Sequence, residues 1–200
     1  MKKIGFFGGT FDPIHFGHIN LALQLSEKHH LDEVLFCIAA RSPFKKNRPP
    51  AAEAKHRLAM TRLAIQDIPG FKVSEIELQR SGISYTIDSL RSLRAEFERG
   101  HEAVQLYILL SDESLENFHL WKNAEEIVQL AAPLVGFRTI SHEKIPASPV
   151  KGALLKGLTL TNRFEISSTQ IRSRLKKGLY CRHLMPFKTL DYIHKHRLYL

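Results

Sequence analysis

The segment that says most about the architecture is Gly8-Gly9-Thr10-Phe11-Asp12-Pro13-Ile14-His15-Phe16-Gly17-His18. It comes directly after an expected buried strand at Ile4–Phe7 and opens an expected helix at residues 16–29. Open α/β sheets bind ligands at such a place, beyond the carboxyl end of a strand. Glycines let main-chain N–H groups approach phosphate oxygens, and a helix N-terminus favours negative charge. The segment therefore predicts a phosphate-binding loop in an α/β protein.

The loop differs from the two common phosphate-binding fingerprints. A Walker A loop would continue into Gly-Lys-Ser or Gly-Lys-Thr, and a dinucleotide fingerprint would read Gly-x-Gly-x-x-Gly. His15 and His18 can share a face of the first helical turn, and Gly17 between them removes a side chain where a phosphate would have to sit. Two imidazoles there can donate to phosphoryl oxygens as charge develops. The alternatives are two ordinary helix-start histidines, or a metal pair, for which no third ligand is apparent nearby.

Apolar β-rich runs alternate with helix-period segments along the rest of the chain. This alternation predicts an α/β fold, a Rossmann-like doubly wound parallel sheet covered on both faces. We expect a single domain over 1–200, with a core at 1–160 and a small helical C-terminal part at 161–200. The further strands are expected at 34–38, 72–78, 104–110 and 131–137, the helices at about 51–65, 87–97, 167–177 and 187–193, and a surface connection at 138–156.

Composition narrows the class of protein. The hydrophobic fraction of 44% and the charged fraction of 24% are ordinary for a globular protein. No run approaches the roughly 18 apolar residues of a membrane span, so we expect no membrane partner. Cys37 and Cys181 each lack a nearby partner, which favours a reducing, cytoplasmic location over a disulfide framework.

The formal net charge of +9 is concentrated toward the C-terminus. Residues 163–200 hold nine Lys or Arg against only two acidic residues. Such a basic end indicates either a polyanionic partner, nucleic acid or a small phosphate-rich molecule, or a solvated surface. A nucleic-acid-binding module should interleave aromatic residues with its basic patch, whereas Tyr180, Phe187 and Tyr192 are expected to pack against helices. We therefore expect no nucleic-acid partner.

Two motifs resemble those of the nucleotidyltransferase superfamily. The loop at residues 8–18 is similar to Gly-Gly-x-Phe-Asp-Pro-x-His-x-Gly-His, and residues 166–172 are similar to Ile-Ser-Ser-Thr-x-Ile-Arg. In the second motif a serine or threonine can cap the helix while free N–H groups and Arg172 face a phosphate. Simple capping beside a surface arginine is the alternative for this segment.

Three further segments resemble nicotinate-nucleotide adenylyltransferases in particular. The Ser-Tyr-Thr helix start of that family, whose threonine contacts the nicotinate ring, corresponds to Thr86 and the two residues before it. Its Phe-x-x-Trp element, whose tryptophan stacks on the ring, corresponds to Phe118 and Trp121. Its Pro-Pro-His-Lys segment corresponds to Ser42-Pro43-Phe44-Lys45, which places Lys45 beside the ligand phosphates. The alternatives are a plain helix start, a core tryptophan and a solvated lysine.

The chain departs from that family near the second substrate. The usual Gly-x-Asp before the tryptophan element becomes Ser111, Asp112 and Glu113, so the carboxylate that contacts the ribose is either Asp112 or Glu113. Ala40 stands where the family prefers asparagine, and Ser42 and Phe44 weaken the lysine motif. Nicotinamide mononucleotide and phosphopantetheine are therefore kept as alternative acceptors.

The resemblance implies transfer of the adenylyl group of ATP to nicotinate mononucleotide, with deamido-NAD and pyrophosphate as products. It assigns His15 and His18 to the triphosphate and the transition state, and Lys45 and Arg172 to the β- and γ-phosphates. Mg²⁺ is expected to arrive with ATP, without a protein metal site. A homo-oligomer is compatible with the sequence. The expected ATP-binding set is Gly8, Gly9, Thr10, Phe11, Gly17, Ile166, Ser167, Ser168 and Thr169, and the mononucleotide set is Thr86, Asp112, Glu113 and Trp121.

Overall fold

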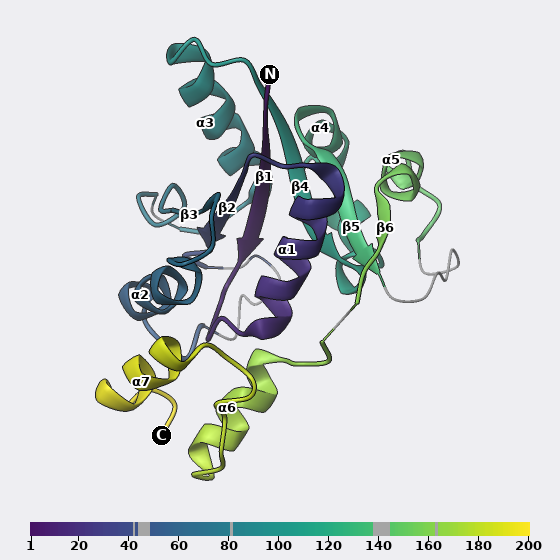
Figure 1. Ribbon diagram of the computed structural model, residues 1–200. Helices are drawn as coiled ribbons and strands as arrows, with labels where there is room; N and C mark the ends of the chain where they lie inside the picture. The colour runs from purple at the N-terminus through teal and green to yellow at the C-terminus, as the bar shows by residue number, and fades with distance from the viewer. Residues whose placement is uncertain (42, 44–48, 81, 138–144, 163) are drawn as a thin grey trace. The chain divides into compact units, whose positions relative to one another are not determined.

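The computed structural model describes residues 1–41, 43, 49–80, 82–137, 145–162 and 164–200 (Figure 1). The strands are β1 (Lys2–Gly9), β2 (Glu33–Ile38), β3 (Phe71–Ser74), β4 (Val104–Ser111), β5 (Ala132–Phe137) and β6 (Leu158–Leu160). The helices are α1 (Phe16–His29), α2 (Ala54–Ile65), α3 (Thr86–Arg99), α4 (Ala124–Leu130), α5 (Lys151–Lys156), α6 (Ser168–Lys176) and α7 (Phe187–Lys195). Two short 3-10 turns, η2 (Asp112–Ser114) and η3 (Phe118–Leu120), follow β4.

The six strands form one sheet in the order β3-β2-β1-β4-β5-β6. β1 pairs in parallel with β4 from Lys2 opposite Val104 to Phe6 opposite Ile108, and β4–β5 and β5–β6 are parallel as well. This is the strand order of the doubly wound dinucleotide-binding fold, whose ligands lie where the order reverses. The predicted α/β fold class is confirmed.

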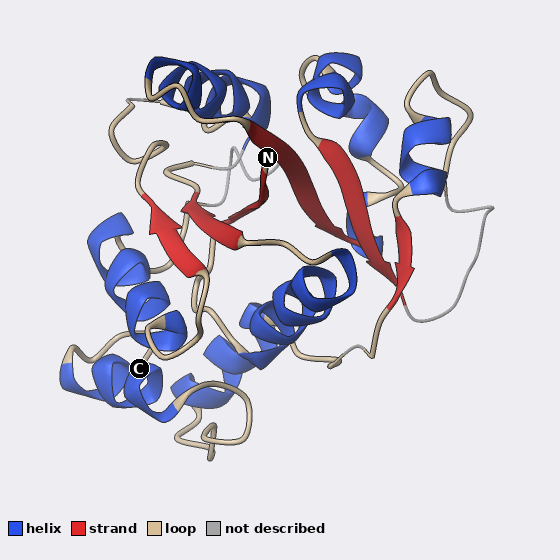
Figure 2. Cartoon of the chain, turned by 45° about the horizontal axis from the view of Figure 1, so that its top comes forward, coloured by secondary structure: helices blue, strands red, loops and turns tan. Residues whose placement is uncertain are grey.

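The chain forms two compact units. The first comprises Met1–Phe7, Leu21–Leu35 and Tyr85–Arg163, and the second comprises Gly8–Asn20, Phe36–Ser84 and Phe164–Leu200. In the first unit α3 packs against α4, and α4 and α5 pack against β5. Figure 2 shows the helices in blue and the strands in red. In the second unit α2 packs against β3 and α7. No helix in the described part of the chain is long and apolar enough to cross a bilayer.

Several expected boundaries were wrong. β3 ends at Ser74 because residues 75–78 form a turn, in which Leu78 N–H donates to the Glu75 carbonyl at 2.8 Å. α2 begins at Ala54, since the N–H groups of Ala51 and Ala52 are bound to a carboxylate outside the helix. The expected connection at 138–156 contains α5, and β6 follows it. α5 is too short for a clear period, and β6 has only three residues.

The expectation that Tyr180 and Phe187 pack against helices is also wrong. Tyr180 is 66% exposed and Phe187 is 56% exposed. The Tyr180 ring stacks on His183, and the Arg182 guanidinium lies 4.6 Å from the centre of the Phe187 ring. These contacts with basic side chains replace burial in the core.

Candidate active site

The two predicted nucleotide motifs meet within the second unit. The Ser168 hydroxyl donates to the Pro13 carbonyl at 2.9 Å. The Arg172 guanidinium donates through Nη1 to the Asp12 carbonyl at 2.7 Å. Two segments about 155 residues apart in sequence are therefore held together by direct hydrogen bonds to the main chain of the loop.

The two histidines of the loop lie face to face. The ring centres of His15 and His18 are 3.7 Å apart, with 27° between the ring planes. The edge of Phe11 meets His18 with ring centres 5.1 Å apart, at 80°. The His18 imidazole is thus held between the rings of His15 and Phe11.

The loop takes a strained path to bring Phe11 against His18. Phe11 has φ of 47°, in the left-handed region that costs energy for a residue with a side chain. A Cβ atom on Gly9 would lie 2.7 Å from the Phe11 ring, so glycine is required there. The second glycine has a comparable role, because a Cβ on Gly17 would lie 3.0 Å from the His15 ring. Room for the His15 ring is thus the visible reason for Gly17.

His15 is a buried imidazole, with only 5% of its surface exposed. Burial disfavours the charged ring and lowers the pKa of His15 to about 4, so the side chain is neutral at pH 7. Its Nδ1 atom is buried and has no hydrogen-bond partner among the described residues. A buried ring nitrogen without a partner costs free energy unless a ligand satisfies it.

A buried carboxylate organises the same loop from the inside. Asp12 is 6% exposed, and its Oδ1 accepts hydrogen bonds from the Tyr199 hydroxyl at 2.6 Å and from Ala52 N–H at 3.1 Å. Its Oδ2 accepts from Ala51 N–H at 2.7 Å and lies 3.9 Å from Nη1 of Arg172. Asp12 therefore connects the loop, the residues before α2, the second motif and the residues after α7.

A buried arginine from α2 supports the loop as well. Arg57 is 1% exposed and donates to the carbonyls of Thr10 at 2.8 Å, Ala39 at 2.7 Å and Ala52 at 3.1 Å. Burial lowers the pKa of its guanidinium, and the nearby Asp12 carboxylate opposes that effect. A buried charge is tolerated only when it is paired and hydrogen-bonded in this way.

Sequence reasoning missed Arg57, Tyr199 and the central role of Asp12. Arg57 lies in an ordinary helical pattern, and Tyr199 belongs to neither nucleotide motif. In the sequence, Asp12 is one residue of the loop motif, with no separate role indicated. Their contacts join positions up to 187 residues apart, for which local spacing contains no signal.

The N-terminus of α6 has the predicted cap. The Ser167 hydroxyl accepts a hydrogen bond from Gln170 N–H at 3.2 Å, and Thr169 Oγ1 accepts from Nη2 of Arg172 at 3.2 Å. Ile166, just before the cap, donates its N–H to the Phe164 carbonyl at 2.8 Å. The first turn of a helix leaves N–H groups without intrahelical partners, which suits an anion.

The expected mononucleotide residues Thr86 and Trp121 belong to the first unit. Thr86 begins α3, after Tyr85 in an extended conformation. Trp121 is only partly buried, and its ring centre lies 4.9 Å from that of the fully buried Phe118. The partly exposed ring is compatible with stacking on a ligand.

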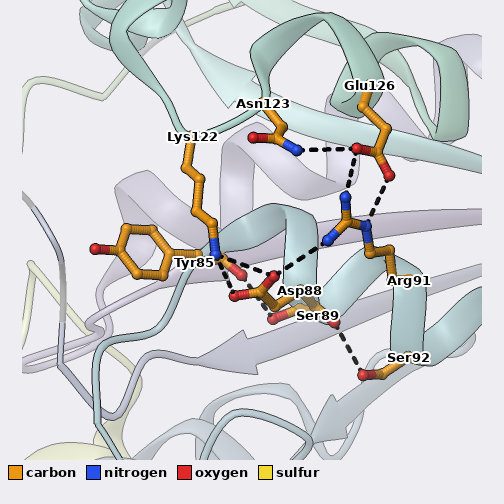
Figure 3. Close-up of polar contacts among 8 residues, drawn as sticks. All are labelled: Tyr85, Asp88, Ser89, Arg91, Ser92, Lys122, Asn123 and Glu126. Atoms are coloured by element: carbon orange, nitrogen blue, oxygen red, sulfur yellow. Dashed lines mark hydrogen bonds and ion pairs between the residues drawn. The ribbon is translucent and has the colours of Figure 1, made fainter.

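A polar network joins the start of α3 to the residue after Trp121 (Figure 3). The Lys122 ammonium lies 3.2 Å from Asp88 Oδ2 and 4.5 Å from the centre of the Tyr85 ring. Beside this pair, Arg91 donates to both carboxylate oxygens of Glu126 at 2.7 and 2.6 Å. The network thus links α3, the tryptophan element and α4.

The remaining predicted residues divide into described and undescribed positions. Asp112 is half-buried and its Oδ1 accepts from the N–H of the exposed Glu113 at 3.0 Å, directly after β4. Ala40 N–H donates to the Ser84 hydroxyl at 2.9 Å. Lys45, with Ser42 and Phe44 of the same segment, lies outside the described residues.

Comparison with known proteins places this geometry in a family. The cytidylyltransferase-like family model matches residues 6–174. A probable nicotinate-nucleotide adenylyltransferase of Thermus thermophilus is 39% identical over 98% of this chain and 99% of its own. One from Opitutus terrae is 37% identical over 98% and 97%, and one from Herpetosiphon aurantiacus is 35% identical over the full length of both. The chain belongs to the nicotinate-nucleotide adenylyltransferase family. The resemblance inferred from the sequence motifs is confirmed.

Solved structures share the fold of this adenylyltransferase family member. Plasmodium falciparum nicotinic acid mononucleotide adenylyltransferase complexed with NaAD superposes with a TM-score of 0.78 at 21% identity. The same protein complexed with APC gives a TM-score of 0.75 at 21% identity, and both matches cover 100% of this chain and 98% of the other. At such identities the likeness establishes the fold.

Proposed function

We propose that this protein transfers the adenylyl group of ATP to nicotinate mononucleotide, giving deamido-NAD and pyrophosphate in NAD biosynthesis. One observation carries the proposal. Ser168 and Arg172 of the second nucleotide motif bind the carbonyls of Pro13 and Asp12 in the first. This brings the two motifs together in a chain whose full-length relatives are named probable nicotinate-nucleotide adenylyltransferases.

In the proposed reaction, an oxygen of the mononucleotide phosphate attacks the α-phosphorus of ATP. A new P–O bond forms there, the bond between the α-phosphorus and the bridging oxygen breaks, and that oxygen leaves with pyrophosphate. The protein then has to position both substrates and stabilise negative charge. The neutral His15, with its buried Nδ1, and the stacked His18 are the side chains we assign to the α-phosphate.

The leaving pyrophosphate is assigned to the second motif. Arg172 keeps part of its side chain exposed, and it lies one turn after Ser168 and Thr169, which begin α6. A cation and a helix N-terminus together favour the charge that builds on the β- and γ-phosphates. Lys45 is proposed to add a second cation to these phosphates.

Mg²⁺ is proposed to enter as part of the MgATP substrate. The basic side chains assigned to the phosphates, His15, His18 and Arg172, have nitrogen donors, whereas Mg²⁺ prefers oxygen ligands in octahedral geometry and keeps several waters. The Asp12 carboxylate already accepts three hydrogen bonds from protein groups. The phosphate oxygens of ATP are therefore the natural ligands of the ion.

The nicotinate ring is assigned to Trp121 and Thr86. The partly exposed Trp121 offers a flat face for stacking, and the α3 N-terminus, where Thr86 lies, favours an anionic carboxylate on the ring. That charge preference argues for nicotinate over nicotinamide mononucleotide. Asp112 or Glu113, directly after β4, is proposed to contact the ribose hydroxyls.

The proposed partners are ATP and nicotinate mononucleotide, and no nucleic-acid or membrane partner is proposed. A homo-oligomer is compatible with the sequence. The proposed compartment is the cytoplasm, where Cys37 and Cys181, both free and buried, would remain reduced.

Pyrophosphate release tests the function directly. The purified protein is incubated with MgATP and, in separate reactions, nicotinate mononucleotide, nicotinamide mononucleotide or phosphopantetheine. The proposal expects the highest kcat/KM with nicotinate mononucleotide, and deamido-NAD as the product by mass spectrometry. A higher kcat/KM with either other acceptor would refute the assigned substrate, and no release with any acceptor would refute adenylyl transfer.

A further inference from the structure

Tyr199 reaches the phosphate loop from beyond α7. Its hydroxyl donates to Asp12 Oδ1 at 2.6 Å, and its main chain adopts φ of 62°, the left-handed conformation. The turn that carries it is held by the hydrogen bonds from Arg197 N–H to the His194 carbonyl and from Leu198 N–H to the Ile193 carbonyl. A specific fold of this segment thus delivers one hydroxyl group to one buried carboxylate.

The hydrogen bonds to Asp12 determine what is left for Arg172. Tyr199 and Ala52 occupy Oδ1, while Ala51 donates to Oδ2. Nη1 of Arg172 remains 3.9 Å from Oδ2, beyond hydrogen-bond distance, and binds the Asp12 carbonyl at 2.7 Å instead. The guanidinium is held beside the carboxylate without forming a hydrogen-bonded pair with it.

An arginine next to an unoccupied carboxylate tends to bind it with two parallel hydrogen bonds. Such a pair would need both oxygens of Asp12. It would also neutralise the positive charge of the guanidinium, which attracts a polyphosphate. We propose that Tyr199 is a positioning residue: its hydroxyl occupies Oδ1 of Asp12, prevents a two-point pair with Arg172, and keeps the guanidinium available to the phosphates of ATP. This inference rests on the proposed function only in taking ATP as the ligand.

The charges around the hydroxyl are consistent with a permanent donor. Burial, followed by the hydrogen bond to Asp12 and its negative charge, raises the pKa of Tyr199, while Arg172 and Arg57 oppose the rise. Tyr199 therefore stays protonated across the pH range of an enzyme assay. Its hydroxyl thus remains a hydrogen-bond donor to Asp12 throughout this range.

The test uses Tyr199→Phe, which removes the hydroxyl and keeps the ring. The matched control is Tyr192→Phe, because the Tyr192 hydroxyl lies 3.0 Å from Nδ1 of His56 and is not bound to Asp12. MgATP is titrated calorimetrically into each protein without acceptor, at a temperature where circular dichroism shows both to be folded. The dissociation constant for MgATP should rise about fivefold in Tyr199→Phe and stay unchanged in Tyr192→Phe. A fivefold change is at the lower end of the range for coupling between two sites.

The same substitution in Arg172→Ala protein distinguishes a positioning role of Tyr199 from a general structural one. In Arg172→Ala protein, Tyr199→Phe should have no further effect on MgATP affinity, because the group through which it acts is gone. The inference would be overturned if Tyr199→Phe lowered MgATP affinity equally with and without Arg172, or if Tyr199→Phe alone left that affinity unchanged. It would also be overturned if Tyr199→Phe raised the KM of the mononucleotide as much as it weakened MgATP binding.

Failure of the proposed function gives a different result. A wild-type protein that binds MgATP and forms no deamido-NAD would refute the acceptor. The MgATP affinities of the variants would still decide the role of Tyr199, because those titrations contain no acceptor.

Discussion

His18 is the residue on which we expect the reaction to depend most. Its ring is fixed between His15 and the edge of Phe11, so its donor group does not need to reorganise when charge develops. Loss of one such preorganised donor lowers kcat by about 10²–10³. His18→Ala should show a loss of this size in the pyrophosphate assay, with an unchanged circular dichroism spectrum. His194→Ala, an exposed histidine on α7, is the control, and a folded His18→Ala enzyme with near-normal turnover would remove His18 from the mechanism.

His15 makes the stability of the protein depend on pH. Its pKa is about 4 in the folded chain because the ring is buried, against 6.5 in an unfolded chain. Protons therefore bind the unfolded state preferentially between these values, and stability that is present above pH 6.5 is lost as the pH falls toward 4. From pH 7 to pH 5 the contribution lost is about 2 kcal/mol, at about 1.4 kcal/mol per pKa unit.

Urea unfolding of wild-type protein and His15→Asn at pH 7 and pH 5 measures this contribution. The variant has no ring to protonate, so its free energy of unfolding should fall less than that of the wild type over this range. Parallel losses in the two proteins would show that His15 titrates normally in the folded state.

For single residues, the sequence identifies the members of a motif and does not reveal contacts between distant segments. The loop and the α6 segment could be recognised because their residues are consecutive. Asp12, Arg57 and Tyr199 act through contacts between distant segments, and one of these, the 2.6 Å bond from Tyr199 to Asp12, spans almost the whole chain. Only the folded structure shows that Tyr199, which follows the last helix, contacts the loop at residues 8–18.

Among the elements, the tryptophan segment offers Trp121, a partly buried aromatic side chain. Trp121→Ala should raise the KM for nicotinate mononucleotide about 5- to 150-fold and leave the KM for ATP nearly unchanged, taking about 1–3 kcal/mol for ring stacking from the range for bases. Steady-state kinetics with each substrate varied in turn gives both values. A structural tryptophan would behave differently, because its truncation would lower the melting temperature and impair both substrates together.

The Lys122–Asp88 pair should fix the tryptophan segment relative to the start of α3. Both side chains are partly exposed, and exposed pairs contribute about 0.2–1 kcal/mol, so Lys122→Met should raise the KM for the mononucleotide by about fivefold at most. Glu126→Gln is the matched control, since it alters the neighbouring Arg91 pair without touching Lys122. A change in the KM for ATP equal to that for the mononucleotide would contradict a role confined to this element.

Element boundaries were predictable where a period or a cap was present. α1 has the predicted bounds, and α6 starts at the predicted serine cap, because these signals are local. α5 and β6 have six and three residues, too few for a period to emerge. The late start of α2 depends on hydrogen bonds to Asp12 from another part of the chain, which no pattern within the helix can indicate.

For the whole molecule, the sequence predicted a parallel α/β sheet and left its strand order open. Alternation of strands and helices is visible along the chain, whereas the order β3-β2-β1-β4-β5-β6 depends on pairing between distant strands. The sequence likewise did not indicate to which compact unit each predicted residue belongs. His15, His18 and Arg172 belong to the second unit, and Thr86 and Trp121 belong to the first.

The charge of the whole molecule should influence the two substrates unequally. The chain has a net charge of +9, and residues 163–200 of it, which include Arg172, contribute most of that excess. The phosphates of MgATP are assigned to Arg172 in this basic part of the chain, so capture of MgATP should weaken more than capture of the mononucleotide as salt screens the positive charge. Between 20 and 200 mM KCl, kcat/KM should fall more steeply for ATP than for nicotinate mononucleotide, and the ATP dependence should be shallower in Arg172→Ala. Equal slopes for both substrates would show that salt acts on the fold or on turnover, and that the basic C-terminal residues do not attract ATP.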